Sequence, residues 1–305
     1  MTILKWQAPP APRGKKSRHG IIAGSTILYH YLQKELLNND IWLFQMLVAR
    51  LIVSLGIWLS PEIYRQLPVL LPFAARDPGS RGNPKKGIPD QWGSATSIGL
   101  FRDDNSLVKA LPKSLTVASG RVKLYDGRRI GGGFVASHVW RGTEIGLAAR
   151  HQLLYSFVPN LVWLPVEVAK LSDREGSFVQ SYLQALSVKI YRAHPLSSDV
   201  GALAEEAWAL LPNPEGIPLQ GLPDLDELNF FEPSNTWLER RIRTIEEVVK
   251  ALVAIDAGGA PGHVVASRYG KSLIDVGPKQ RKALGDRLSS YAASVRAAGL
   301  ADGDH

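Results

Sequence analysis

The 305-residue sequence contains no cysteine at all. This absence excludes disulfide bridges, thiolate nucleophiles and cysteine-ligated zinc, and it is consistent with a reducing compartment, so we expect a cytoplasmic protein. Any metal ion must then be bound by histidine, asparagine, aspartate or glutamate. The 45% hydrophobic content and the aromatic residues indicate a folded protein with a real core.

The sequence also lacks an uncharged hydrophobic run that is long enough to span a membrane. Residues 1–20 have no apolar core, so we expect no secretory signal in them; with their prolines and basic residues they are expected to form a flexible basic arm. Residues 41–60 are apolar and long enough to span a membrane, but Arg50 lies at their centre, where a charge is costly. We therefore expect a buried helix and no membrane partner, with a membrane-anchored protein as the alternative.

Acidic residues are scarce in one part of the chain. The net charge is +8, and residues 76–150 contain 13 Lys and Arg against 6 Asp and Glu, whereas residues 151–305 contain 15 against 19. Such a local excess of positive charge favours binding to a nucleic acid backbone, although it also serves solubility. The basic segment of residues 76–113 is rich in proline and glycine, and we expect it to be a DNA-contacting loop through Arg76, Arg81, Lys85, Lys86, Arg102 and Lys109.

Periodicity divides the rest of the chain. Residues 21–120 are expected to form a helical subdomain that ends in the basic loop, with Ser60 as the N-cap of a helix that begins at Pro61. Residues 196–305 are expected to be mainly helical, ending in an amphipathic helix over 279–298. Between them, residues 121–195 predict a strand, a Gly-rich turn, a second strand that ends on His138, a long loop, and a helical run opened by Asn160.

This order of elements suits phosphodiester hydrolysis. A neutral imidazole can deprotonate water, a hard cation can polarise the phosphoryl group, and a β-hairpin followed by a helix can hold both. His138 is placed for the first role. Asn160 offers a side-chain carbonyl that could hold either the metal or the loop that carries the histidine.

The segments SHVW and PNLVWLP resemble the ββα-metal nucleases of the HNH family, in which a histidine at a strand end is followed by an Asn-Leu element. The run NLVWLPVEVAKLSDREGSF is similar to the His-Asn-Asn variants of restriction-type and methylation-dependent endonucleases. The resemblance covers residues 138–192. It implies an α+β fold in which a small ββα-metal module, residues 121–195, is surrounded by helices.

The resemblance also implies roles for particular residues. His138 would be the general base, Asn160 a structural or metal-binding residue, and Mg²⁺ or Mn²⁺ the cofactor. The sequence departs from the family at Ser137, where many members have an acidic ligand, and at Ala169, the position of the third family residue. Further metal ligands would then come from Asp126, Asp173 or His151, and Lys170 would stabilise phosphate charge.

We therefore expect a sequence-specific endonuclease of restriction type that binds double-stranded DNA, as a homodimer if its sites are palindromic. Arg128, Arg129 and Arg141 add positive charge around the site and are further candidates for DNA contacts. Two alternatives stay open. One is a DNA-binding protein with a degenerate nuclease fold. The other is a nuclease of the PD-(D/E)XK class, for which Glu167 and Lys170 are spaced one residue too far apart.

Overall fold

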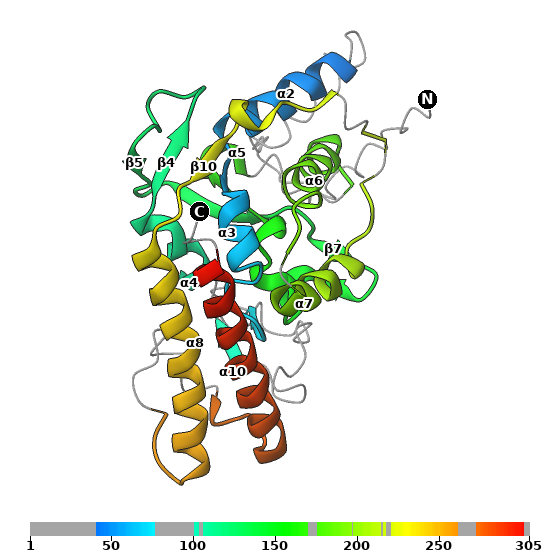
Figure 1. Ribbon diagram of the computed structural model, residues 1–305. Helices are drawn as coiled ribbons and strands as arrows, with labels where there is room; N and C mark the ends of the chain where they lie inside the picture. Colours follow the sequence, from blue (N-terminus) through cyan, green and yellow to red (C-terminus); the bar gives the residue numbers. More distant parts are fainter. Residues whose placement is uncertain are drawn as a thin grey trace, which may run out of the picture.

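A six-stranded sheet lies at the centre of the computed structural model, which describes residues 41–76, 101–103, 106–169, 176–196, 198–214, 216–217, 221–261 and 273–301 (Figure 1). The strand order is β5-β4-β10-β1-β9-β6, and only the β1–β10 pair is parallel. The strands are β1 (Ile57–Leu59), β4 (Thr116–Ser119), β5 (Arg128–Arg129), β6 (Phe134–His138), β9 (Leu161–Pro165) and β10 (Asn229–Phe231). With helices packed around this sheet, the predicted α+β class is confirmed.

The sheet curls so that its two edge strands approach each other. Strand β5 ends at Arg129 and β6 begins at Phe134, and five residues of chain span at most about 18 Å. A flat sheet would separate these edge strands by five spacings, about 24 Å in all. The rings of Tyr125, in the turn before β5, and Phe134 lie 6.0 Å apart between centroids, so side chains bridge the two edges.

Asn160 opens a strand and not the predicted helical run, which was wrong at this point. A short 3-10 helix, η6 (Val158–Asn160), leads into β9, and helix α5 (Val166–Ala169) begins only after the strand. The first four residues of β9 are fully buried, because the strand lies between β1 and β6 with both faces covered. The sequence of such a strand is a continuous apolar run, and its periodicity does not distinguish it from the sequence of a buried helix.

The hairpin predicted to end on His138 does not form either. Strand β5 pairs with β4, while β6 pairs with β9, so the two strands on either side of the glycines belong to opposite edges of the sheet. Residues 121–127 form turns in which the Ser119 hydroxyl accepts a 2.8 Å hydrogen bond from the Val122 amide. Residues 121–195 consequently share one sheet with strands from the predicted flanking regions, 21–120 and 196–305.

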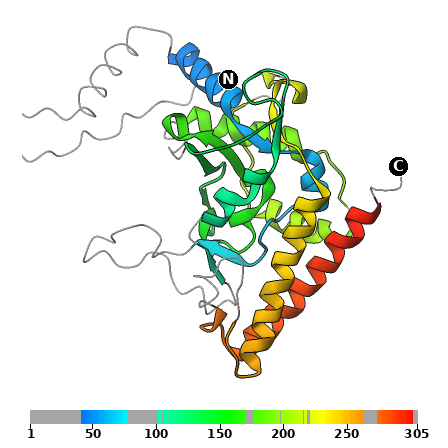
Figure 2. The same ribbon diagram turned by 90° about the vertical axis from the view of Figure 1, so that its left-hand side faces the viewer.

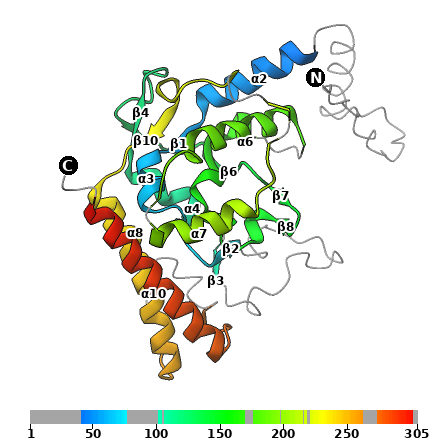
Figure 3. The same ribbon diagram turned by 45° about the vertical axis from the view of Figure 1, so that its right-hand side comes forward.

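Helices α2 (Ile41–Leu55), α3 (Pro61–Gln66), α6 (Phe178–Tyr191) and α7 (Ser198–Ala209) pack around this sheet, and Figure 3 shows α6 and α7 in front of it. The predicted cap of α3 is confirmed, since the Ser60 hydroxyl accepts a hydrogen bond from the Ile63 amide and Pro61 is the first helical residue. The cap of α6 is Ser177.

Helix α2 is only partly buried, contrary to the prediction of a buried helix over residues 41–60. It ends at Leu55, and β1 follows directly. Its apolar side chains Leu43, Phe44, Leu47 and Leu51 are 43–56% exposed, because α2 packs on α6 and β9 through its opposite face. In the part of the chain that the structure describes, no helix is both long and apolar enough to cross a membrane.

The C-terminal part is helical, as predicted. Helices α8 (Asn235–Asp256) and α10 (Pro278–Ala301) pack antiparallel as a hairpin along one side of the molecule (Figures 1 and 2). Tyr291 fixes α10 to the body, because its hydroxyl accepts from the Val69 amide at 3.0 Å and donates to the Val69 carbonyl at 2.9 Å.

Short elements complete the fold. The predicted loop of residues 76–113 contains regular structure at its described ends, where β2 (Ala74–Arg76) pairs in parallel with β3 (Phe101–Asp103) and helix α4 (Ser106–Ala110) follows. The remaining short elements are β7 (Gly142–Thr143), β8 (Gly146–Leu147), η3 (Leu111–Ser114), η4 (Ala148–Arg150), η5 (Leu154–Ser156) and η8 (Leu225–Glu227).

Candidate active site around His138

His138 is the last residue of β6, as the sequence predicted. It is paired with Leu161 across the β6–β9 ladder, which holds its backbone at the edge of the sheet. The residue is half-buried, and Nε2 of its ring lies 3.0 Å from the backbone carbonyl oxygen of Tyr155. The imidazole is therefore held from the strand at one end and from η5 at the other.

The surroundings keep this imidazole neutral. The pKa of His138 is lowered from 6.5 to about 4, mainly by burial and also by the nearby cations of Arg76 and Arg141, against an opposing effect of the Tyr155 carbonyl. A carbonyl oxygen can only accept a hydrogen bond, so the proton of the neutral ring resides on Nε2. Nδ1 then carries the lone pair and is the atom that can take up a proton.

Asn160 holds the loop that follows His138. Its side chain is fully buried; Oδ1 accepts a 2.6 Å hydrogen bond from the Trp140 amide, and Nδ2 donates a 3.0 Å hydrogen bond to the Leu154 carbonyl. The Val139 amide also donates to the Asn160 carbonyl, at 3.0 Å. Of the two roles considered for Asn160, these contacts correspond to loop anchoring, and they leave its amide group turned into the protein.

The basic residues predicted to bind DNA lie in several parts of the structure, and only some of them are near His138. Arg76 and Arg141 lie near enough to His138 to influence its protonation, and both are half-buried with further interactions in the protein. Arg128 and Arg129 are exposed on β5, at the other edge of the sheet. Lys109 lies on α4, and Arg102 on β3. Outside the described residues lie Arg81, Lys85, Lys86, Lys170 and Asp173.

Asp126 does not join His138. Its Oδ1 accepts a 3.1 Å hydrogen bond from the Ser119 amide within the β4–β5 turn. The neighbouring Tyr125 contacts Phe134, at the start of β6, whereas His138 ends that strand about 13 Å further along. Of the two predicted acidic ligands, the described one therefore faces its own turn.

A divalent metal ion does not fit the donors that can be placed. Within the described ranges there is no group of three His, Cys, Asp or Glu side chains that could hold an ion. The Asn160 amide is turned inward, and the third candidate, His151, accepts a 3.3 Å hydrogen bond from the Leu153 amide through Nδ1. The binding of Mg²⁺ or Mn²⁺ stays a prediction.

Tyr155 contacts His138 in this candidate site and was not among the residues that the sequence pointed to. Its contribution to the site is a backbone carbonyl, which every residue type possesses, so no side-chain pattern could have revealed it. The ring itself is fully buried, with its centroid 6.0 Å from that of His138.

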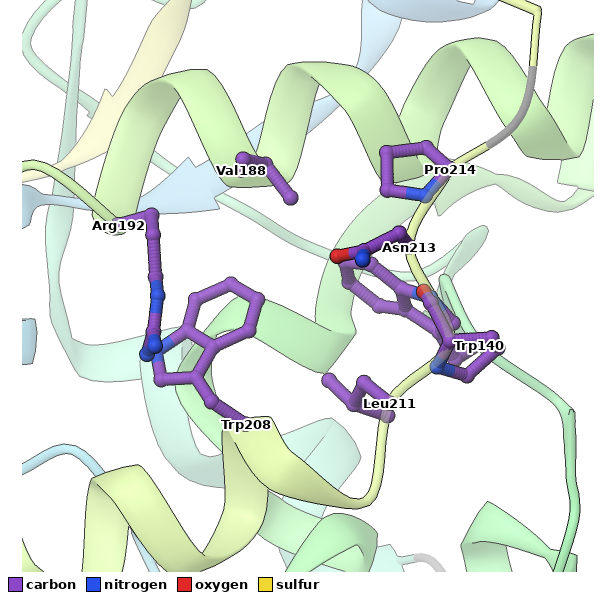
Figure 4. A pocket seen from close by; sticks show the side chains of 8 residues that line it. Trp140, Val188, Arg192, Trp208, Leu211, Asn213 and Pro214 are labelled. Atoms are coloured by element: carbon purple, nitrogen blue, oxygen red, sulfur yellow. The ribbon is translucent and has the colours of Figure 1, made fainter.

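A small cavity lies between α6, α7 and residues 211–214, on the other side of Trp140 (Figure 4). The indole rings of Trp140 and Trp208 meet edge to face at 5.9 Å, and Arg192 lies over Trp208 while pairing with Glu205 at 2.9 Å. The volume of this cavity is about 90 Å³. An apolar cavity known to bind benzene has a volume of about 150 Å³, so we assign no nucleobase to this smaller one.

No protein-family model, no curated protein and no solved structure matches the chain.

Proposed function

We propose that the chain is a sequence-specific DNA endonuclease in which His138 is the general base. The observation that carries the proposal is the half-buried, neutral imidazole held at a strand end beside Arg76 and Arg141. A neutral imidazole with a free lone pair can accept a proton, and guanidinium groups neutralise phosphate charge. The local excess of basic residues over 76–150 supports a nucleic acid as the substrate.

The reaction follows from the tautomer. Nδ1 of His138 takes a proton from a water molecule as the water oxygen forms a bond to phosphorus. The ester bond to the leaving oxygen breaks, and that oxygen takes up a proton from solvent. Negative charge grows on the phosphoryl oxygens during this step, where Arg76 and Arg141 stabilise it. The Nε2–H bond to Tyr155 shares the positive charge that the imidazole gains.

The low pKa of His138 shapes the expected pH dependence. A base with a pKa of about 4 in the free enzyme is already deprotonated at pH 5. Since kcat/KM reports the free enzyme, we expect it to stay level from pH 7 down to about pH 5, where an ordinary histidine would already be charged.

The test is plasmid cleavage by wild type, His138→Gln and the control His194→Gln, with Mg²⁺, Mn²⁺ or EDTA, on unmodified and cytosine-methylated DNA. Glutamine at position 138 keeps a donor for the Tyr155 carbonyl but cannot accept a proton. His194 lies just beyond the end of α6, a helix that carries none of the residues named in the proposal. We expect discrete fragments from wild type and His194→Gln and none from His138→Gln. Equal cleavage by all three would refute the proposal.

A DNA-binding protein without catalysis is the second candidate. It is favoured by the inward-turned amide of Asn160 and by the scattered acidic side chains of the described residues. Salt-dependent binding of DNA without cleavage under any metal condition would select it. The predicted homodimer is tested in the same preparations by light scattering after size exclusion.

A further inference from the structure

Two segments that each carry an arginine lie side by side near His138. The amide of Phe73 donates a 2.9 Å hydrogen bond to the Gln152 carbonyl, and an antiparallel bridge joins Val69 to Phe157 earlier in the same two segments. Beyond these contacts, β2 packs against η4. Arg76 ends β2 and Arg150 ends η4, so the two arginines belong to adjoining segments.

Both side chains are partly enclosed by the protein. The Nε atoms of Arg76 and Arg150 are buried, and each residue as a whole is half-buried. Arg141 adjoins the same place, because its carbonyl accepts a 2.8 Å hydrogen bond from the Ala148 amide at the start of η4. Arg76 and Arg141 thus both act on His138 at the end of β6, and Arg150 lies on η4, which adjoins the segments of both.

The backbone before Arg76 is in an unusual conformation. Phe73 has a φ of 64°, the one positive value of a non-glycine residue in the described ranges, and bulky residues rarely adopt it. Its ring is buried, with the Arg287 guanidinium of α10 4.4 Å from its centroid. The strained residue is thus held by the Gln152 carbonyl and by Arg287 immediately before β2 begins.

We propose that Arg150 and Arg76 form a phosphate-binding pair beside His138, with a phosphodiester of the DNA backbone as its ligand. Guanidinium groups bind phosphate through paired N–H donors, and stems fixed in advance lose little entropy on binding. Both residues have other interactions within the protein. Each guanidinium has five N–H donors, so a phosphate can share them. The identity of the ligand as DNA rests on the proposed function, whereas the pairing of the two arginines rests on the contact between β2 and η4.

The experiment measures binding of a short fluorescent DNA duplex by anisotropy over a range of salt concentrations. Each phosphate contact contributes about 0.9 to the slope of log K against log salt. We expect Arg150→Gln to lower this slope by about one and to weaken binding about eightfold at about 0.1 M salt. Arg150→Lys, which keeps the charge if the glutamine variant fails to fold, should retain the slope and bind more weakly. Arg243→Gln, which removes an exposed charge from α8, is the matched control and should bind as wild type.

The outcomes separate this inference from the proposed function. If Arg150→Gln and Arg150→Lys both bind as Arg243→Gln does, the phosphate pair is refuted, while cleavage that depends on His138 would still stand. If both Arg150 variants bind as predicted and His138→Gln cleaves like wild type, the pair is supported and the catalytic proposal fails. Wild type that binds no duplex at low salt overturns both.

Discussion

Acid should destabilise this protein through His138, and replacing that residue by glutamine should remove the effect. The pKa of His138 is about 4 in the folded protein and 6.5 when the chain is unfolded. Between these values the unfolded chain binds more protons at this position than the folded one, so the free energy of unfolding falls as the pH falls. Each pKa unit corresponds to about 1.4 kcal/mol, and the loss is therefore about 3 kcal/mol by pH 4.

Urea unfolding followed by tryptophan fluorescence measures this effect, since Trp58, Trp140 and Trp163 are all buried reporters. The free energy of unfolding of wild type minus that of His138→Gln should fall by about 3 kcal/mol between pH 7 and pH 4. Burial also lowers the pKa of His151, but this residue is present in both proteins and cancels in the difference. A difference that stays constant, or grows toward low pH, would refute the view that His138 is desolvated.

Three further predictions concern the supports of the site. Asn160→Ala should cost about 3 kcal/mol, because it leaves two buried backbone groups without hydrogen bonds, and an unchanged urea midpoint would contradict this. Tyr291→Phe should lose both bonds to Val69 and lower the free energy of unfolding by about 2 kcal/mol, which calorimetry would detect as a lower Tm. Arg76→Met should raise the pKa of His138 in an NMR titration while burial keeps it below 6.5; a lower or unchanged pKa would show that Arg76 does not act on the ring.

Local signals in the sequence predicted local structure well. Ser60 followed by Pro61 marks the start of α3, because a hydroxyl cap and a fixed proline φ act within one turn of the chain. The amphipathic pattern of residues 279–298 correctly predicts α10, because helical periodicity is also a local property of the sequence. The placement of His138 at a strand end was correct too, since β6 ends at that residue.

Long-range pairing could not be predicted in the same way. The residues around Gly131 and Gly133 do not indicate that the strands on either side belong to opposite edges of a curled sheet. Which strands pair depends on the contacts of β5 with β4 and of β6 with β9, and not on the glycines between β5 and β6. The fully buried run of β9 likewise lacks the polar positions that distinguish a strand from a helix. Arg150 was not singled out as a DNA contact, because its partner Arg76 lies 74 residues earlier and only the fold brings them together.

Chemical rescue of His138→Ala tests the central claim most directly. Alanine removes the imidazole, and small imidazole molecules added in solution can replace a missing general base. We expect the single-turnover rate of DNA cleavage to fall at least about a hundredfold in this variant and to recover in part with added imidazole in its neutral form, while His194→Ala behaves as wild type. Cleavage by His138→Ala at the wild-type rate without imidazole would contradict the account.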